Sequence, residues 1–183
     1  MSEEMLVCYC SPTLAGQKTG SLFSCPYSSQ KMIIKEIREF NQKLTQKGIR
    51  IIPVRISDKR MLVYVYRPEK LKEDFSDEKT QIILKCKGYD CTNLSQCICR
   101  LIQKLQSDPD FPHEIGLFLG YPAEDVKGFI ENKAACSKCS GCWKVYGDEQ
   151  AARILFKKYK KCTEIYCRRW KSGVAVEQLT ITI

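Results

Sequence analysis

Two kinds of hydrophobic periodicity follow one another in the first third of the chain. Apolar side chains first recur at helical spacing, at Ile33, Ile37, Phe40 and Leu44. Ser28 or Ser29 supplies the N-cap of this predicted helix, and Gly48 ends it. Two β-rich runs come next, Ile49–Ile56 and Met61–Tyr66, and the polar Ser-Asp-Lys-Arg segment between them suits a hairpin. A chain that changes period in this way is typical of an α/β protein.

The rest of the chain continues the alternation. Further strands are predicted at Met5–Cys10, Ile115–Leu119, Trp143–Tyr146 and Val174–Ile183. Further helices are predicted to begin at or near Pro68, Ser76, Leu94, Pro122 and Asp148. Pro53 places the first hairpin strand at a sheet edge or at a bulge, because proline cannot donate to a strand ladder. We therefore expect one domain over residues 1–183, with a single mixed sheet that contains one antiparallel hairpin and is flanked by helices.

Twelve cysteines and a single histidine point to thiolate chemistry. Disulfide scaffolds are short, secreted and loop-rich, whereas this chain has 183 residues and long amphipathic segments. No charged-then-apolar leader follows Met1, and no apolar stretch approaches the length of a membrane span. We therefore expect a cytoplasmic protein that makes no membrane contact and keeps its thiols reduced.

Three of the cysteines, Cys136, Cys139 and Cys142, recur at a regular three-residue spacing. Two adjoining Cys-x2-Cys units can turn around one soft ion, so this spacing favours zinc or part of an iron–sulfur cluster. A fourth donor has to come from elsewhere. Cys162 and Cys167 lie at a suitable chain distance, although their spacing differs from that of a zinc ribbon. The alternative is a set of reduced, partly buried or redox-labile thiols without a metal, and the sequence leaves both interpretations open.

The segment from Ser11 to Tyr27 is rich in Ser, Thr, Gly and Pro and is predicted to be a long loop between a strand and a helix. Backbone amides and a helix N-terminus can hold an anion at such a place. The candidate ligand-binding residues of this loop are Thr13, Gly16, Lys18 and Thr19. The order of residues is not that of a P-loop. Alternatively, the glycines only let the connection fold back.

His113 is the remaining candidate ligand-binding residue. We expect it at the rim of a pocket shared with the Ser11–Tyr27 segment, where Lys18 meets an anionic group. A small enzyme that combines the Ser11–Ser21 loop with His113 is the corresponding alternative, and no catalytic residue is identified for it. The alternative structural role of a histidine after Phe-Pro is that of a strand-end residue bonded to the backbone.

Positive charge gathers towards the C-terminal end of the chain. The chain contains thirty Lys and Arg and twenty-one Asp and Glu. Eight of the basic residues lie in the segment from Arg153 to Lys171, where Glu164 is the one acidic residue. The predicted helix here has an apolar face made of Ala152, Leu155, Tyr159, Cys162 and Tyr166. The intervening positions are basic: Lys157, Lys158, Lys160, Lys161, Arg168 and Arg169. Such a face suits an acidic protein such as a small electron carrier, and nucleic acid less well, unless it is only a solvated surface.

Several segments together resemble one known family. They are Ser11-Pro-Thr-Leu-Ala-Gly-Gln-Lys, Ser21-Leu-Phe, the block from Phe111 to Ile130, and Trp143-Lys-Val-Tyr-Gly-Asp. The pattern is similar to an uncharacterised bacterial family, domain of unknown function 3793, over nearly the whole chain. The resemblance implies a cytosolic protein of an anaerobic bacterium and assigns no activity, substrate or catalytic residue. The dense cysteines at residues 136–142 depart from the pattern of that family.

The expected function is therefore ligand or partner binding, linked to the metal or redox physiology of an anaerobe. The competing hypotheses are the small enzyme described above and a nucleic-acid-binding module built on the basic helix.

Overall fold

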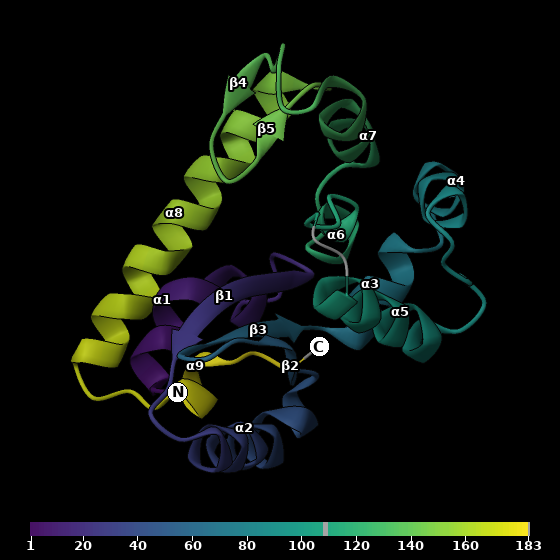
Figure 1. The fold of residues 1–183 in the computed structure, drawn as a ribbon. Coiled ribbons are helices and arrows are strands. Elements are labelled where there is room, and N and C mark those ends of the chain that lie inside the picture. Colours follow the sequence, from purple (N-terminus) through teal and green to yellow (C-terminus); the bar gives the residue numbers. More distant parts are fainter. Residues whose placement is uncertain (108–109, 183) are drawn as a thin grey trace. The chain divides into compact units, whose positions relative to one another are not determined.

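The computed structural model describes residues 1–107 and 110–182. It divides into two compact units: Met1–Glu69 with Tyr159–Ile183, hereafter unit 1, and Lys70–Lys158, hereafter unit 2 (Figure 1). The boundaries fall inside two helices, α3 (Pro68–Asp74) and α8 (Glu149–Lys171), so each helix contributes residues to both units. The prediction of one domain over the whole chain stays a prediction.

Unit 1 is built on a three-stranded antiparallel sheet. Its strands lie side by side in the order β1 (Gly20–Pro26), β3 (Arg60–Tyr66), β2 (Arg50–Ile56) (Figure 1). The pairing of β2 with β3 confirms the predicted hairpin. Pro53 lies on the edge strand β2, where the register shifts between Pro53 and Arg55, and this confirms the predicted edge or bulge position.

Helices supply the rest of the core of unit 1. They are α1 (Glu3–Leu14), α2 (Gln30–Leu44), the 3-10 turn η1 (Thr45–Lys47), the second part of α8, and α9 (Val176–Leu179). Phe23 on β1 pairs with Val63 on β3, and alternate residues of these strands point to one face of the sheet. The buried side chains on that face form a single cluster with those of α1, α2 and α9. This packing confirms the helix predicted between the serine N-cap and Gly48, with its apolar stripe.

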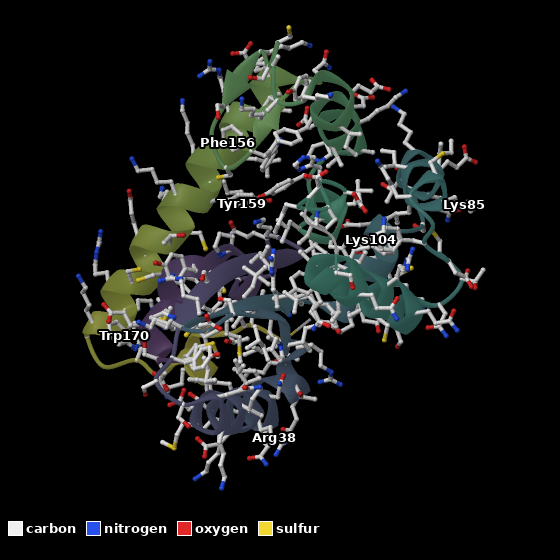
Figure 2. The ribbon with its side chains drawn as sticks, in the orientation of Figure 1. Arg38, Lys85, Lys104, Phe156, Tyr159 and Trp170 are labelled. Carbon is white, nitrogen blue, oxygen red and sulfur yellow. The ribbon has the colours of Figure 1, made fainter. Side chains whose placement is uncertain are left out.

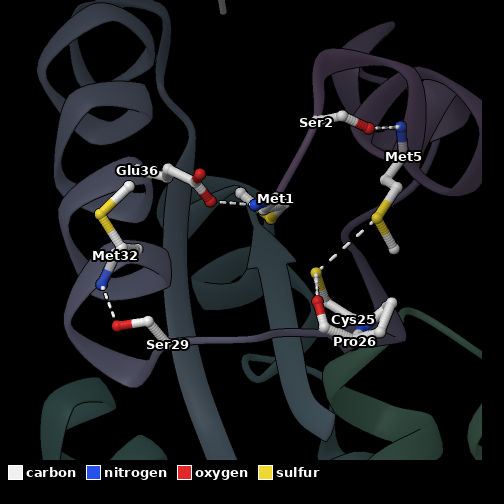
Figure 3. Close-up of polar contacts among 8 residues, drawn as sticks. All are labelled: Met1, Ser2, Met5, Cys25, Pro26, Ser29, Met32 and Glu36. Atoms are coloured by element: carbon white, nitrogen blue, oxygen red, sulfur yellow. Dashed lines mark hydrogen bonds and ion pairs between the residues drawn. The ribbon is translucent and has the colours of Figure 1, made fainter. Parts of the chain in front are cut away.

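Serine side chains fix the starts of the first two long helices (Figure 3). The Ser2 hydroxyl accepts from the Met5 amide at the start of α1, at 3.3 Å. The Ser29 hydroxyl accepts from the Met32 amide at the start of α2, at 3.5 Å, so the predicted N-cap is Ser29. Figure 3 also shows the N-terminal amine paired with the Glu36 carboxylate of α2.

Arg67, directly after β3, connects several segments of unit 1. It is 2 % exposed, and its guanidinium donates four hydrogen bonds of 2.7–3.0 Å to backbone carbonyls. The acceptors are the carbonyl oxygens of Thr13, Leu14, Lys47 and Ile181. Because the last carbonyls of a helix have no partner within that helix, this one cation satisfies the end of α1 and ties it to η1 and to the residues after α9.

Unit 2 is mainly helical. It contains most of α3, then α4 (Glu78–Cys86), α5 (Leu94–Ser107), α6 (Ile115–Phe118) and α7 (Ala123–Asn132), a two-stranded sheet of β4 (Cys139–Ser140) and β5 (Lys144–Val145), and the first part of α8. Helix α7 packs against α4, α6 and β5. The helices predicted to begin near Pro68, Ser76, Leu94, Pro122 and Asp148 are confirmed. Asp77 rather than Ser76 caps α4, because the Asp77 carboxylate accepts from the Thr80 amide at 2.8 Å.

Three predicted strands are wrong, because the segments are helical. Residues Met5–Cys10 lie in α1, Ile115–Leu119 form α6 with its end, and Val174–Ile183 contain α9. A short apolar run fits a buried strand and a buried helix equally well, and Ser2 with the acidic first turn of α1 decides for the helix at the N-terminal end. The long loop predicted over Ser11–Tyr27 is also wrong, since it contains the last turn of α1 and all of β1.

The prediction of a mixed α/β protein is confirmed, whereas the prediction of a single sheet is only partly right. The three-stranded sheet of unit 1 is separate from the β4–β5 pair, and both sheets are antiparallel. None of the helices in the described part of the chain combines the length and the apolar composition needed to cross a bilayer.

The Arg67 network predicts a large stability effect for a conservative change. Arg67→Lys keeps the charge but cannot reach all four carbonyls, so unfolding free energy should fall by about 2–4 kcal/mol. Arg38, exposed on α2 (Figure 2), gives the matched control Arg38→Lys, which should change stability by less than about 0.5 kcal/mol. Urea denaturation followed by circular dichroism measures both, and equal stability of the two variants would contradict the role given to Arg67.

Candidate functional site

An apolar pocket lies within unit 2. Its volume is about 260 Å³, and it is lined by His113, Gly116, Tyr121, Asp125, Val126, Phe129, Ser140, Trp143 and Lys144. The lining comes from the segment around α6, from α7 and from the β4–β5 pair. Ligand pockets are usually apolar cavities with a few convergent polar groups, and this composition fits that description.

Aromatic rings form much of the pocket wall. The rings of Tyr121 and Trp143 stack with their centroids 4.7 Å apart and an interplanar angle of 26°. The Trp143 ring also contacts Phe156 of α8 (labelled in Figure 2) in a T-shaped arrangement, with the ring centroids 4.6 Å apart. His113 makes a second T-shaped contact, with Phe129 at 4.9 Å. These contacts fix the orientation of the aromatic rings that line the pocket.

The buried carboxylate of Asp125 holds the two aromatic segments together. Asp125 is 3 % exposed, and its Oδ2 accepts from the Trp143 indole N–H at 2.6 Å. Its Oδ1 accepts from the backbone amides of Tyr146 and Gly147, both at 2.7 Å. Because each oxygen of this carboxylate already accepts a hydrogen bond, Asp125 fixes the end of β5 against α7 and orients the Trp143 ring.

Close packing at Gly116 shapes the floor of the pocket. A Cβ atom at this position would lie 2.7 Å from Val126 Cγ2 and 3.1 Å from Tyr121 Cδ2. Such distances are shorter than van der Waals contact, so α6 approaches α7 this closely only because residue 116 has no side chain. The segment that carries His113 is thereby seated against α7.

A charged network anchors the residue next to His113. Glu114 is 3 % exposed, and its Oε1 accepts from Lys104 Nζ of α5 (labelled in Figure 2) at 2.8 Å and from the Tyr89 hydroxyl at 3.1 Å. Burial alone would raise the pKa of Glu114, but the Lys104 ammonium and the hydrogen bonds to the carboxylate outweigh burial and lower it. Burial and the nearby Glu114 charge raise the pKa of Tyr89, so its hydroxyl stays a donor.

The predicted ligand-binding residues fall in different units. Thr13, Gly16, Lys18 and Thr19 belong to unit 1, and His113 belongs to unit 2. Their common pocket therefore stays a prediction. His113 is exposed at the edge of the pocket described above.

The four unit 1 candidates are part of a folded connection between α1 and β1. Thr13 is buried, and its hydroxyl shares a hydrogen bond of 2.9 Å with that of Ser21. Gly16 has a φ of 66°, which fits the fold-back role of a glycine. Thr19 is buried, and the charge of the half-buried Lys18 acts on the Cys10 thiol. None of these four side chains lines the pocket of unit 2 described above.

The three regularly spaced cysteines lie in and beside the β4–β5 pair. Cys136 precedes β4 with a φ of 57°, Cys139 begins β4, and Cys142 lies in the turn before β5. Cys136 and Cys142 are exposed and Cys139 is half-buried. Within residues 1–107 and 110–182 no group of three or more His, Cys, Asp or Glu side chains is arranged to hold a metal. The geometry therefore gives zinc or an iron–sulfur cluster no support, and metal binding stays a prediction.

Most pocket residues were not predicted as site residues. Only His113 was. The usable signal was the i, i+4 spacing of Asp125 and Phe129, which places both on one face of α7. Ser140 and Lys144 carry no such signal, because only the β4–β5 pairing brings them to the pocket.

A comparison with protein families covers nearly the whole chain, including the segments that build this pocket. Residues 6–180 match the model of a family described as a protein of unknown function, DUF3793. The chain belongs to this family. All the pocket-lining residues except Ser140 lie in the DUF3793-like segments identified from the sequence, Phe111–Ile130 and Trp143–Asp148. No curated protein and no solved structure matches the chain.

The Glu114 network predicts a pH-dependent stability. Glu114→Gln leaves the Lys104 ammonium without its carboxylate, so unfolding free energy near pH 7 should fall by about 3 kcal/mol. Because the folded-state pKa of Glu114 lies below its ordinary value, the carboxylate stabilises the protein fully above about pH 4.5. That stabilisation is lost as the pH falls through the folded-state pKa, and the two proteins should then converge.

Urea denaturation between pH 3 and pH 7 measures this difference. Glu131→Gln is the matched control, because the Glu131–Lys127 pair is exposed and 3.8 Å long. It should change stability by less than about 0.5 kcal/mol at every pH. A Glu114→Gln deficit that stays constant down to pH 3 would argue against the ion pair.

Proposed function

We propose that this DUF3793 protein binds a small planar aromatic compound in the pocket of unit 2, and that the compound carries a carbonyl or carboxylate oxygen. The stacked Tyr121–Trp143 wall is the observation that carries the proposal. Tyr121, Trp143 and Phe129 all line the pocket, so a planar ring bound there gains both apolar burial and ring contacts. A volume of about 260 Å³ lies slightly below that of ordinary ligand pockets, so it favours one substituted ring or one fused pair.

The polar groups of the pocket are mainly donors. Asp125 uses its carboxylate oxygens on N–H groups of the protein. Lys144 donates one Nζ hydrogen to the Ala134 carbonyl, at 2.5 Å, and its ammonium group carries two further hydrogens that can donate. The Ser140 hydroxyl and the His113 imidazole add further donor capacity at the lining. A ligand oxygen that accepts hydrogen bonds complements this set.

A binding role is favoured over the enzyme alternative. The hydroxyls of Thr13 and Ser21 are buried and bonded to one another. In the part of the chain that the structure describes, no hydrogen bond is found between Ser140 and His113, the hydroxyl and imidazole of the pocket lining. The predicted link to metal or redox physiology stays a prediction.

The pocket predicts a fluorescence response to simple aromatic probes. The chain has two tryptophans, so Trp170→Phe leaves Trp143 as the reporter. In that background, benzoate, benzamide and indole-3-acetate should change Trp143 emission saturably, whereas cyclohexanecarboxylate, which has no flat ring, should bind at least about tenfold more weakly.

Two pocket variants and one neighbour test the location. His113→Ala and Tyr121→Leu should each weaken binding of the best aromatic probe about tenfold or more at unchanged melting temperature. Phe111→Ala is the control, because Phe111 is an exposed aromatic residue near His113 that does not line the pocket. Unchanged binding in both pocket variants, or no response to any aromatic probe, would refute the proposal.

We propose a second function, partner binding, for the basic face of α8. Tyr159 and Cys162 are buried and Leu155 is half-buried, as predicted for the apolar face. The predicted basic positions are all exposed: Lys157, Lys158, Lys160, Lys161, Arg168 and Arg169. On α8, which is described throughout, the one ion pair found joins Arg153 to Glu149, so these six cations stay available to an acidic partner such as a small electron carrier.

Charge reversal tests this second function. Lys157→Glu with Lys161→Glu should slow association with an acidic ferredoxin by about tenfold at low salt and flatten its salt dependence. Lys31→Glu with Lys35→Glu, two exposed positions with the same spacing on α2, changes the net charge equally. Equal effects of the two pairs would show that net charge, rather than this face, steers association. If the face instead belongs to a nucleic-acid-binding module, RNA should bind the protein, and Lys157→Glu with Lys161→Glu should weaken that binding more than Lys31→Glu with Lys35→Glu.

A further inference from the structure

Two cysteines that are far apart in the sequence meet on the surface of unit 1. The Sγ atoms of Cys8 on α1 and Cys167 on α8 are 3.7 Å apart, across 159 positions of the chain. Both residues belong to unit 1. Cys8 is exposed and Cys167 is half-buried, so reagents in solution can reach the pair.

The packing of both helices fixes this approach. Leu6 and Val7, next to Cys8, are fully buried in the core of unit 1. Three residues of α8 pack against the same core: Cys167, Tyr166 and Trp170, of which Trp170 is labelled in Figure 2. A second contact of α8 lies two turns before Cys167, where the Tyr159 hydroxyl donates to the Gln17 carbonyl at 3.3 Å. The two thiols are therefore held near one another by the fold and do not depend on a chance contact of mobile side chains.

We propose that Cys8 and Cys167 form a redox-active dithiol, which low-molecular-weight disulfides oxidise to an intramolecular disulfide. A disulfide needs its sulfurs about 2.05 Å apart, so the two atoms have to approach by roughly 1.7 Å. Side-chain rotation on two surface helices supplies a movement of this size.

The order of the reaction follows from exposure and charge. Burial and the neighbouring Cys8 raise the pKa of the Cys167 thiol, so the exposed Cys8 reacts first. The Cys8 thiol loses its proton to water, and its thiolate attacks one sulfur of the external disulfide. That bond breaks, one external thiol leaves, and a mixed disulfide stays on Cys8.

The second step closes the pair. Cys167 loses its proton, attacks the Cys8 sulfur and expels the second external thiol. Two protein thiols and one external disulfide thus become one protein disulfide and two external thiols. The protein loses two electrons and two protons, and the external disulfide gains them.

Other thiols of the chain are in less favourable surroundings for this reaction. Cys10 and Cys162 are buried, and Cys97 donates to the Asp90 carbonyl at 2.9 Å. Cys91 and Cys97 interact with one another in unit 2 and are the competing pair. Burial raises the pKa of Cys97 to about 11, which disfavours its thiolate.

Oxidation of the full chain with glutathione disulfide tests the proposal. After timed exposure, remaining thiols are alkylated and the protein is digested for mass spectrometry. The peptide that joins Cys8 to Cys167 should be the earliest cross-link and should disappear on reduction with dithiothreitol. Closing so long a loop should also raise the melting temperature by roughly 5 °C or more.

Single serine variants separate the two steps. Cys167→Ser should trap glutathione on Cys8, whereas Cys8→Ser should abolish the cross-link and leave Cys167 largely unmodified. Cys99→Ser, a change at an exposed cysteine on α5, is the matched control and should leave the cross-link unchanged. Earlier cross-linking of Cys91 to Cys97, or mixed disulfides on other cysteines without a Cys8–Cys167 link, would overturn the proposal.

Discussion

One guanidinium determines how the ends of unit 1 come together. The last carbonyls of α1 have no partner inside the helix, and a buried carbonyl without a hydrogen bond is costly. Arg67 reaches two of these carbonyls and also those of Lys47 and Ile181. Because the Ile181 amide in turn donates to the Leu14 carbonyl, the C-terminal residues are fastened to the end of α1.

In unit 2 a buried charged side chain also forms hydrogen bonds with groups from several segments, but here the charge is negative. Asp125 is a buried carboxylate that is satisfied by three N–H groups rather than by a cation. Backbone dipoles can stabilise a buried charge in this way without a paired ion. The carboxylate links α7 to the Trp143 indole and to the end of β5, so the aromatic wall of the pocket depends on it. The pocket is therefore built around an acid whose two oxygens both accept hydrogen bonds from the protein.

The sequence predicted those parts of the fold whose signal lies within one segment. Helix α2 shows its apolar stripe and its serine cap directly, and the β2–β3 hairpin shows two β-rich runs with a polar turn. Residues 5–10 and 115–119 are too short for their period to separate strand from helix. Strand β1 was missed because Gly20–Pro26 has little strand character of its own and is defined by its pairing with β3. The same limit explains the site, where His113 was found but its aromatic neighbours are assembled by tertiary contacts.

Cysteine abundance by itself says little about reactivity, because the fold gives each thiol a different environment. Burial raises the pKa of Cys10 to about 12, so at neutral pH this residue acts as a small apolar side chain. Cys136 and Cys142, beside the β4–β5 pair, are exposed, and no group of three or more His, Cys, Asp or Glu side chains within the described residues is arranged to hold a metal. Cys8 and Cys167 differ from both groups, since they combine access to solvent with a second sulfur nearby. Proximity converts a reaction between two molecules into a reaction within a single chain. The proximity of a second sulfur, rather than the number of thiols, therefore distinguishes a redox-active pair from a surface that is only rich in cysteine.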